Sequence, residues 1–213
     1  MRFSVIMPVY LGDYPTRGKN PEYKFKRAIE TFLIQEFKDA ELIIVADGCR
    51  IAESIYKQYF TQEPMIRFKF IEKQPLFSGR VRQTGIEMAQ GEIICYLDAD
   101  DIFGTKHLAI INEHFDTKKY DWIYYNDYLI INEVFNTLER QMSCQPCHIG
   151  TSCIAHKRSI GAVWGDRYGH DWAFISGYLH GKRAGIKIPT PQYYVCHCPG
   201  GIDFKNYDNS INS

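Results

Sequence analysis

The sequence predicts an α/β fold, a single Rossmann-like domain with a mostly parallel central sheet flanked by helices. Short apolar runs, of the kind that buried parallel strands need, alternate with segments of helical spacing through the first half of the chain. Polar motifs follow three of these runs, at the strand ends where such sheets bind ligands. A length of 213 residues suits one domain, and 45% apolar with 23% charged residues excludes wholesale disorder.

The first half contains four predicted strands and three predicted helices. The strands are residues 3–9, 41–46, 66–71 and 93–97. The helices are the apolar stripe from Phe25 to Leu33, residues 51–60, and the stretch from Val81 to Ala89. Three consecutive strand–helix–strand units imply right-handed crossovers and a parallel sheet with helices on both faces.

The second half is less regular. We expect a helix over about residues 106–115, strands at 122–126 and 128–131, and a helix at 171–179 that has an Asp at its start. A loop rich in Cys, Pro and Gly spans residues 143–150. The polar, Asn-rich tail after Gly200 is expected to fray.

Three carboxylates, Asp98, Asp100 and Asp101, come directly after the fourth predicted strand. Like charges this close repel each other unless a cation or hydrogen-bond donors compensate them. Mg²⁺ and Mn²⁺ typically combine one or two carboxylates with substrate phosphates, so this cluster predicts a metal–phosphate site. The alternative is a helix cap, which explains one carboxylate but not three.

These motifs together resemble the family 2 glycosyltransferases, which have the GT-A fold. The resemblance rests on Pro8-Val9-Tyr10 after the first strand, Asp47-Gly48 after the second, Arg82 with Gly85, and the run GEIICYLDADD. It covers residues 3–115 well and the remainder loosely. The sequence departs from the family pattern at Leu11, where Asn is usual, at the longer basic loop that follows, and at Cys49, where Ser is usual.

The resemblance implies roles for several residues. Pro8, Val9, Tyr10 and Asp47 would hold the nucleotide base, with a uridine-type donor as the first expectation because a carboxylate can accept the imide N–H of uracil. Arg82 would bind the diphosphate, with Arg80 as its competitor. Asp98 would contact the ribose or metal-bound water, and Asp100 would be the direct ligand of Mn²⁺ or Mg²⁺.

Sugar transfer with inversion needs one base to take the proton of the acceptor hydroxyl. Family members commonly carry Glu-Asp at the start of a helix after the acidic motif, and His170-Asp171 occupies that place here. Asp171 is therefore the predicted base, with an ordinary helix cap as its alternative. His170 could tune Asp171, act as base itself or be structural. His197 could be a further metal or phosphate ligand, or simply a packed or solvent-facing histidine.

The second half also gathers five of the seven cysteines. Cys144 and Cys147, followed by His148, have the spacing that can hold one Zn²⁺, with Cys196 or Cys198 among the ligands that could complete the site. No second Cys-x-x-Cys pair is present, so reduced, packed thiols are favoured over structural zinc.

The predicted function is metal-dependent, inverting transfer of a sugar from a nucleoside diphosphate donor, with UDP as the first expectation, to an acceptor hydroxyl. The alternatives are a nucleotidyltransferase acting on a sugar phosphate, disfavoured because no Gly-rich loop follows the first strand, and a non-catalytic Cys/His metal- or sugar-binding module. The expected acceptor is a saccharide or a lipid-linked saccharide. Residues 1–115 would bind the donor, 116–200 would form the acceptor side, and 201–213 would be a tail.

The net charge and the apolar content limit the kinds of partner that the sequence predicts. Lysine plus arginine equal aspartate plus glutamate at 25 each, which argues against bulk binding of nucleic acid. No run approaches the ~20 apolar residues of a membrane helix, and the first residues read as a strand rather than a signal peptide. We therefore expect a cytoplasmic protein, with peripheral attachment to a membrane as the second option.

Overall fold

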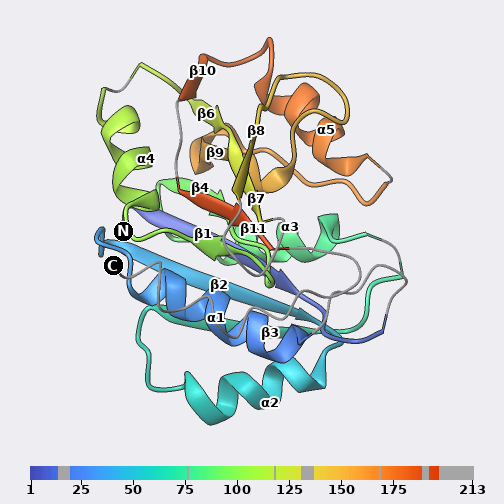
Figure 1. Cartoon of the computed structure of the whole chain (residues 1–213). Helices are drawn as coiled ribbons and strands as arrows, with labels where there is room; N and C mark the ends of the chain where they lie inside the picture. The colour runs from blue at the N-terminus through green and yellow to red at the C-terminus, as the bar shows by residue number, and fades with distance from the viewer. Residues whose placement is uncertain are drawn as a thin grey trace.

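The computed structural model describes residues 1–13, 20–75, 77–117, 119–130, 137–167, 169–188 and 192–196. Within them, a seven-stranded sheet has the order β10-β6-β9-β4-β1-β2-β3 (Figure 1). Its strands are β1 (Phe3–Val9), β2 (Ala40–Asp47), β3 (Ile66–Ile71), β4 (Ile93–Tyr96), β6 (Trp122–Tyr125), β9 (Ile154–Lys157) and β10 (Gly185–Ile188). All neighbours pair in parallel except at β9, which runs antiparallel to both β4 and β6. The predicted α/β fold with a mostly parallel sheet is confirmed.

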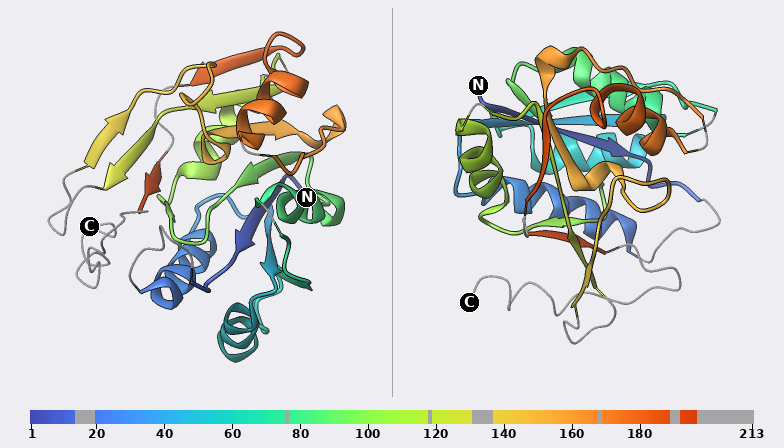
Figure 2. Two further views of the ribbon diagram at one scale, coloured as in Figure 1. Left: turned by 90° about the vertical axis from the view of Figure 1, so that its right-hand side faces the viewer. Right: turned by 90° about the horizontal axis from the view of Figure 1, so that it is seen from above.

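A smaller sheet includes the strand that directly follows the acidic motif. It has the order β5-β11-β7-β8 and consists of β5 (Ile102–Phe103), β11 (Tyr193–Val195), β7 (Asp127–Ile130) and β8 (Thr137–Arg140). The β7–β8 hairpin extends away from the large sheet (Figure 2). Because β11 pairs with β5, a strand near the end of the chain is fixed beside the residues that follow the acidic motif.

Helices cover both faces of the large sheet, with α1 and α3 on opposite sides of it (Figure 2). The helices are α1 (Pro21–Leu33), α2 (Arg50–Tyr59), α3 (Gly79–Met88), α4 (His107–Asp116) and α5 (His170–Phe174). A single helix was expected over residues 171–179, but α5 ends at Phe174 and a π-helical turn (Ile175–Leu179) follows it. Short 3₁₀ turns lie at Thr151–Cys153 and Arg158–Ile160.

The core includes β1 and β2, which lie inside the large sheet. Every residue of these two strands is buried, because each strand has a hydrogen-bonded neighbour on both edges and helices on both faces. The predicted apolar stripe of α1 faces this core, with Phe25, Ile29 and Phe32 completely buried. The sheet is therefore a rigid platform whose strand ends can hold a site.

Two buried histidines make the core sensitive to acid. His107, the first residue of α4, stacks on Phe103 at 3.9 Å between ring centroids, and burial lowers its pKa to about 3. His156 on β9 lies 2.8 Å from the Tyr96 hydroxyl, and burial lowers its pKa to about 4. Since the unfolded chain binds protons at histidine below about pH 6.5, it takes up more protons than the folded chain between that pH and about 4. Stability therefore falls as the pH falls through this window.

Replacing His107 with Phe is expected to flatten this acid dependence. The variant keeps the stacked ring on Phe103 but has no group to protonate, so it loses about 2 kcal/mol less stability between pH 7 and pH 5 than the wild type does. Urea unfolding at the two pH values measures the difference. An equal loss in both proteins would show that His107 is not a source of the acid sensitivity.

Candidate functional site

A cavity of about 710 Å³ opens at the carboxyl ends of β1, β2 and β4. Its walls include all the described residues that were predicted to hold the nucleotide and the metal, namely Pro8, Val9, Tyr10, Asp47, Arg82, Asp98 and Asp100. The predicted base, Asp171, does not line the cavity. Parallel strands bring their carboxyl ends to one edge of the sheet, which is why motifs about 40 to 50 residues apart meet here. His197 lies outside the described residues.

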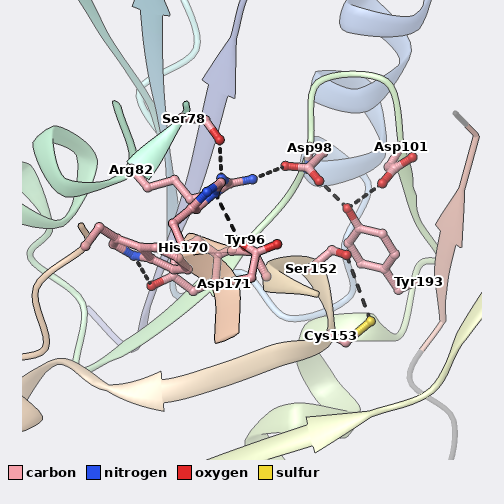
Figure 3. Close-up of polar contacts among 12 residues, drawn as sticks. Ser78, Arg82, Tyr96, Asp98, Asp101, Ser152, Cys153, His170, Asp171 and Tyr193 are labelled. Carbon is pink, nitrogen blue, oxygen red and sulfur yellow. Dashed lines mark hydrogen bonds and ion pairs between the residues drawn. The ribbon is translucent and has the colours of Figure 1, made fainter. Parts of the chain in front are cut away.

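Arg82 is the centre of the polar contacts in this cavity (Figure 3). It lies in the first turn of α3 and is buried. Its Nη2 donates to Asp98 Oδ1 at 2.9 Å, while its Nη1 donates to the Ser78 hydroxyl and lies 3.2 Å from His170 Nε2. The indole of Trp164 lies 5.6 Å from the guanidinium. Arg82, rather than its competitor Arg80, thus presents a fixed guanidinium to the cavity.

The three carboxylates of the acidic motif have different surroundings. Asp98 and Asp100 line the cavity, whereas Asp101 is buried and accepts from the Tyr193 hydroxyl at 2.8 Å and from the Cys196 backbone N–H at 2.7 Å. Burial raises the pKa of Asp101 well above its usual value, and the neighbouring Asp100 and Asp98 raise it further. Asp101 therefore joins the acidic motif to β11 and is not part of the cavity wall.

The carboxylates of Asp98 and Asp100 are the side chains in the cavity that could be ligands of a divalent cation. Burial raises the pKa of Asp98, the Arg82 charge lowers it in part, and the carboxylates of Asp100 and Asp171 raise it again. In the described part of the chain, no three His, Cys, Asp or Glu side chains gather as a metal site. Two carboxylates together with phosphate oxygens from a substrate would suit Mg²⁺ or Mn²⁺, since these ions commonly bind only one or two carboxylates of the protein.

Asp171 lies at the first turn of α5, beside the same cluster (Figure 3). Its Oδ1 accepts a hydrogen bond from the buried hydroxyl of Thr151 and lies 3.2 Å from His170 Nε2. The side chain keeps 37% of its surface exposed, so one edge of the carboxylate reaches solvent. A single side chain, His170, therefore lies between Asp171, the predicted base, and Arg82, the predicted diphosphate ligand.

The nucleotide end of the cavity contains a residue that the sequence analysis missed. Lys73 follows β3, and its Nζ donates to Asp47 Oδ2 at 2.6 Å while lying 4.5 Å from the centre of the Tyr10 ring. The backbone N–H of Gln74 donates to Asp47 Oδ1 at 2.6 Å. Ligands bind at the carboxyl ends of parallel strands, and Lys73 follows the predicted strand β3 just as Asp47 ends β2. Its position after β3 could therefore have identified it from the sequence.

The two departures from the family pattern that the structure describes lie against each other. The Leu11 backbone N–H donates to Cys49 Sγ at 3.3 Å, and both residues are buried. This contact joins the loop after β1 to the turn before α2. The basic loop continues through residues 14–19, which lie outside the described residues.

The cysteines of the described residues are free thiols and gather no metal site with His, Asp or Glu. Cys153 is buried and donates to Asp127, Cys196 packs with Ile102 and Ile130, and Cys147 is exposed. These placements do not support the zinc alternative for the described cysteines. Cys198 lies outside that part of the chain. Among the helices that the structure describes, none has the length and apolar character needed to cross a membrane.

Comparisons with known proteins agree with this geometry. The sequence model described as "Glycosyl transferase family 2" matches residues 4–181. An uncharacterized glycosyltransferase of Methanocaldococcus jannaschii is 31% identical over 131 residues, which are 58% of this chain and 42% of that protein. The putative colanic acid biosynthesis glycosyl transferase WcaA of Escherichia coli is 33% identical over 113 residues, 52% of this chain and 40% of WcaA. The chain thus spans less than half the length of these relatives.

Solved structures show the same fold. TarS of S. aureus, residues 1–349 in complex with UDP-GlcNAc, has a TM-score of 0.72 at 15% identity, over 92% of this chain and 58% of that one. The mannosyltransferase PcManGT of Pyrobaculum calidifontis, in complex with GDP-Man and Mn²⁺, has a TM-score of 0.67 at 13% identity, over 91% and 56%. The fold is therefore of the GT-A class. The chain belongs to glycosyl transferase family 2.

Proposed function

We propose that this chain transfers a sugar from a nucleoside diphosphate donor, UDP in the first instance, to an acceptor hydroxyl with inversion and with a divalent cation. The observation that supports this most is that Arg82, Asp98 and Asp100 line one cavity and that Asp171 lies beside it, connected to Arg82 through His170. The cavity could hold a diphosphate beside Arg82 while the carboxylate of Asp171 activates an acceptor. The UDP-GlcNAc complex of TarS supports a uridine donor.

The nucleotide base would occupy the end of the cavity formed by Pro8, Val9, Tyr10 and Asp47. Asp47 already accepts from Lys73 and Gln74, but each carboxylate oxygen has a second lone pair that could accept the imide N–H of uracil. Tyr10 lines the cavity and is 37% exposed, and its ring would contact the planar base.

The diphosphate would lie between Arg82 and the acidic motif. The guanidinium of Arg82 is held by Ser78 and Asp98, and a fork of donors suits phosphate oxygens. Asp100 would bind Mn²⁺ or Mg²⁺, with Asp98 beside it and His197 as a proposed further ligand. When bound, the cation supplies positive charge to the departing diphosphate oxygens.

Asp171 would act as the base. The acceptor oxygen forms a bond to the anomeric carbon while the bond from that carbon to the diphosphate oxygen breaks, and the hydroxyl proton passes to the Asp171 carboxylate. The transition state should be oxocarbenium-like, as in glycosyl chemistry generally. Attack from the side opposite the leaving group gives inversion.

Thr151 should matter to this step because its hydroxyl orients the base. We expect Thr151→Val to lower kcat by roughly 10-fold with UDP affinity unchanged, since a hydrogen bond to a charged group is lost, and Thr151→Ser to keep most activity. Thr31→Val is the matched control, because Thr31 is also buried but its hydroxyl donates to the Ala28 carbonyl and accepts from the Phe103 backbone N–H rather than orienting Asp171. Equal activity of the Val and Ser variants at position 151 would contradict this role.

The acceptor is proposed to be a saccharide or a lipid-linked saccharide. The names of relatives support this class, among them colanic acid biosynthesis and the poly(ribitol-phosphate) β-N-acetylglucosaminyltransferase TarP of Staphylococcus aureus, 29% identical over 109 residues. In this proposal residues 1–115 bind the donor and 116–200 form the acceptor side. The protein would work in the cytoplasm or at a membrane surface.

A panel of nucleotide sugars tests the proposal. Each compound is added with Mn²⁺ or Mg²⁺, and the unfolding temperature and the release of nucleoside diphosphate are measured. A bound donor stabilises the folded chain, so one UDP-sugar should raise the unfolding temperature and be turned over. Stabilisation by a nucleoside triphosphate with release of pyrophosphate would favour a nucleotidyltransferase instead, and no metal-dependent nucleotide effect at all would favour a non-catalytic module.

A further inference from the structure

His170 lies between the predicted diphosphate arginine and the predicted base, and it is only partly exposed, with 14% of its side-chain surface accessible (Figure 3). The rings of Phe77 and Trp164 lie near it, each with its centre 5.8 Å from the imidazole centre. Two charged side chains reach it, Arg82 from α3 and Asp171 from its own helix. Asp98 acts on it through Arg82.

One ring nitrogen of His170 has a fixed role. Nδ1 lies 3.2 Å from the backbone carbonyl of Arg167, and a carbonyl oxygen can only accept a hydrogen bond. Nδ1 therefore carries a hydrogen in both charge states of the ring. The charge state is decided at Nε2 alone.

Nε2 faces two partners with opposite requirements. It lies 3.2 Å from Arg82 Nη1, which always donates, and 3.2 Å from Asp171 Oδ1, which accepts when ionised. A bare Nε2 accepts from Arg82 and has nothing to offer Asp171. A protonated Nε2 donates to Asp171 and repels Arg82, so each state of the ring satisfies only one neighbour.

From this geometry we propose that His170 is a positioning residue that couples donor binding to the base. Without donor, neutral His170 accepts from Arg82; a bound nucleoside diphosphate takes over the Arg82 donors, and His170 takes a proton from solvent and donates to Asp171. The inference rests on the proposed function, because it needs the diphosphate beside Arg82. The negative charge of the diphosphate both competes with His170 for the Arg82 guanidinium and stabilises the protonated imidazole of His170.

The consequence is that Asp171 receives its second hydrogen bond only when a donor is present. Thr151 donates to Oδ1 in the structure, and His170 would join it on the same oxygen. The other oxygen then remains for the acceptor hydroxyl. The base would reach its working geometry only after the donor has bound.

Nitrogen-15 NMR of histidine-labelled protein tests the coupling, with UDP and Mg²⁺ as the ligand. The chain has seven histidines, and His170→Asn identifies the signal by its disappearance. Without UDP, we expect one protonated and one bare ring nitrogen for His170. At saturating UDP, confirmed by calorimetry on the same sample, both nitrogens should be protonated.

Two results would contradict the coupling in different ways. Saturating UDP that leaves the His170 signals unchanged overturns the coupling but not the proposed function, whereas failure of UDP to bind overturns both. His170→Asn should also lower kcat at saturating donor by roughly 10- to 100-fold, as expected for a lost hydrogen bond to a charged group. His180→Asn, at an exposed histidine near the same helix, is the control and should have wild-type kcat.

Discussion

Asp171→Asn is expected to lower kcat by about 10²- to 10⁴-fold while UDP binding stays at its wild-type affinity. Asparagine has nearly the same shape and can still accept the Thr151 hydrogen bond through its carbonyl oxygen. It cannot take a proton from the acceptor, so only the chemical step should suffer. Single-turnover measurements with saturating donor, together with calorimetry of UDP, separate the two effects.

Asp121→Asn is the matched control for this substitution. Asp121 is 35% exposed, close to the exposure of Asp171, but it pairs with Lys157 at the opposite edge of the large sheet. The control should retain wild-type kcat. A similar loss of kcat in both variants, or a weakened UDP affinity in Asp171→Asn alone, would contradict the assignment of Asp171 as the base.

The acidic motif gives the second large effect, because its neighbouring carboxylates should respond in opposite ways. Asp100→Asn is expected to weaken UDP binding in Mn²⁺ by more than about 10-fold and to leave binding without metal unchanged, since the residue lines the cavity and would hold the ion. Its folding stability should stay near that of the wild type. Calorimetry with and without Mn²⁺ measures this.

Asp101→Asn should show the reverse. The buried Asp101 accepts hydrogen bonds from the Tyr193 hydroxyl and the Cys196 backbone N–H, and an amide could accept only one of them while turning its NH₂ group toward the other donor. We expect the unfolding free energy to fall by about 1–3 kcal/mol while the Mn²⁺ dependence of UDP binding is kept. Loss of the metal dependence in Asp101→Asn but not in Asp100→Asn would show that the roles within the motif are exchanged.

The parallel half of the fold could be predicted because its signals are local. Each of the strands β1 to β4 is an apolar run bounded by turn residues, and β3 matches its predicted limits. β9 was missed, although it lies between β4 and β6. Its short IAHK segment carries no period, and only the pairing with two neighbours makes it a strand.

The candidate site divides in the same way. Asp47, Asp98 and Asp100 could be placed because they follow strands at one edge of the sheet, whereas Arg82 was identified through the resemblance to the family. The roles of Thr151 and Asp101 could not, since each depends on a contact with a distant residue, Asp171 or Tyr193. Such contacts arise from tertiary packing and leave no spacing in the sequence.

The central claim is that this cavity binds a nucleoside diphosphate with a divalent cation through Arg82 and Asp100. Calorimetric titration of UDP into the wild-type chain, with and without Mn²⁺, tests it most directly. We predict one site that is saturated in Mn²⁺ and is weakened by more than about 10-fold when the metal is withdrawn or Asp100 is replaced by Asn. No binding of UDP in Mn²⁺, or equal affinity under all three conditions, would contradict the claim.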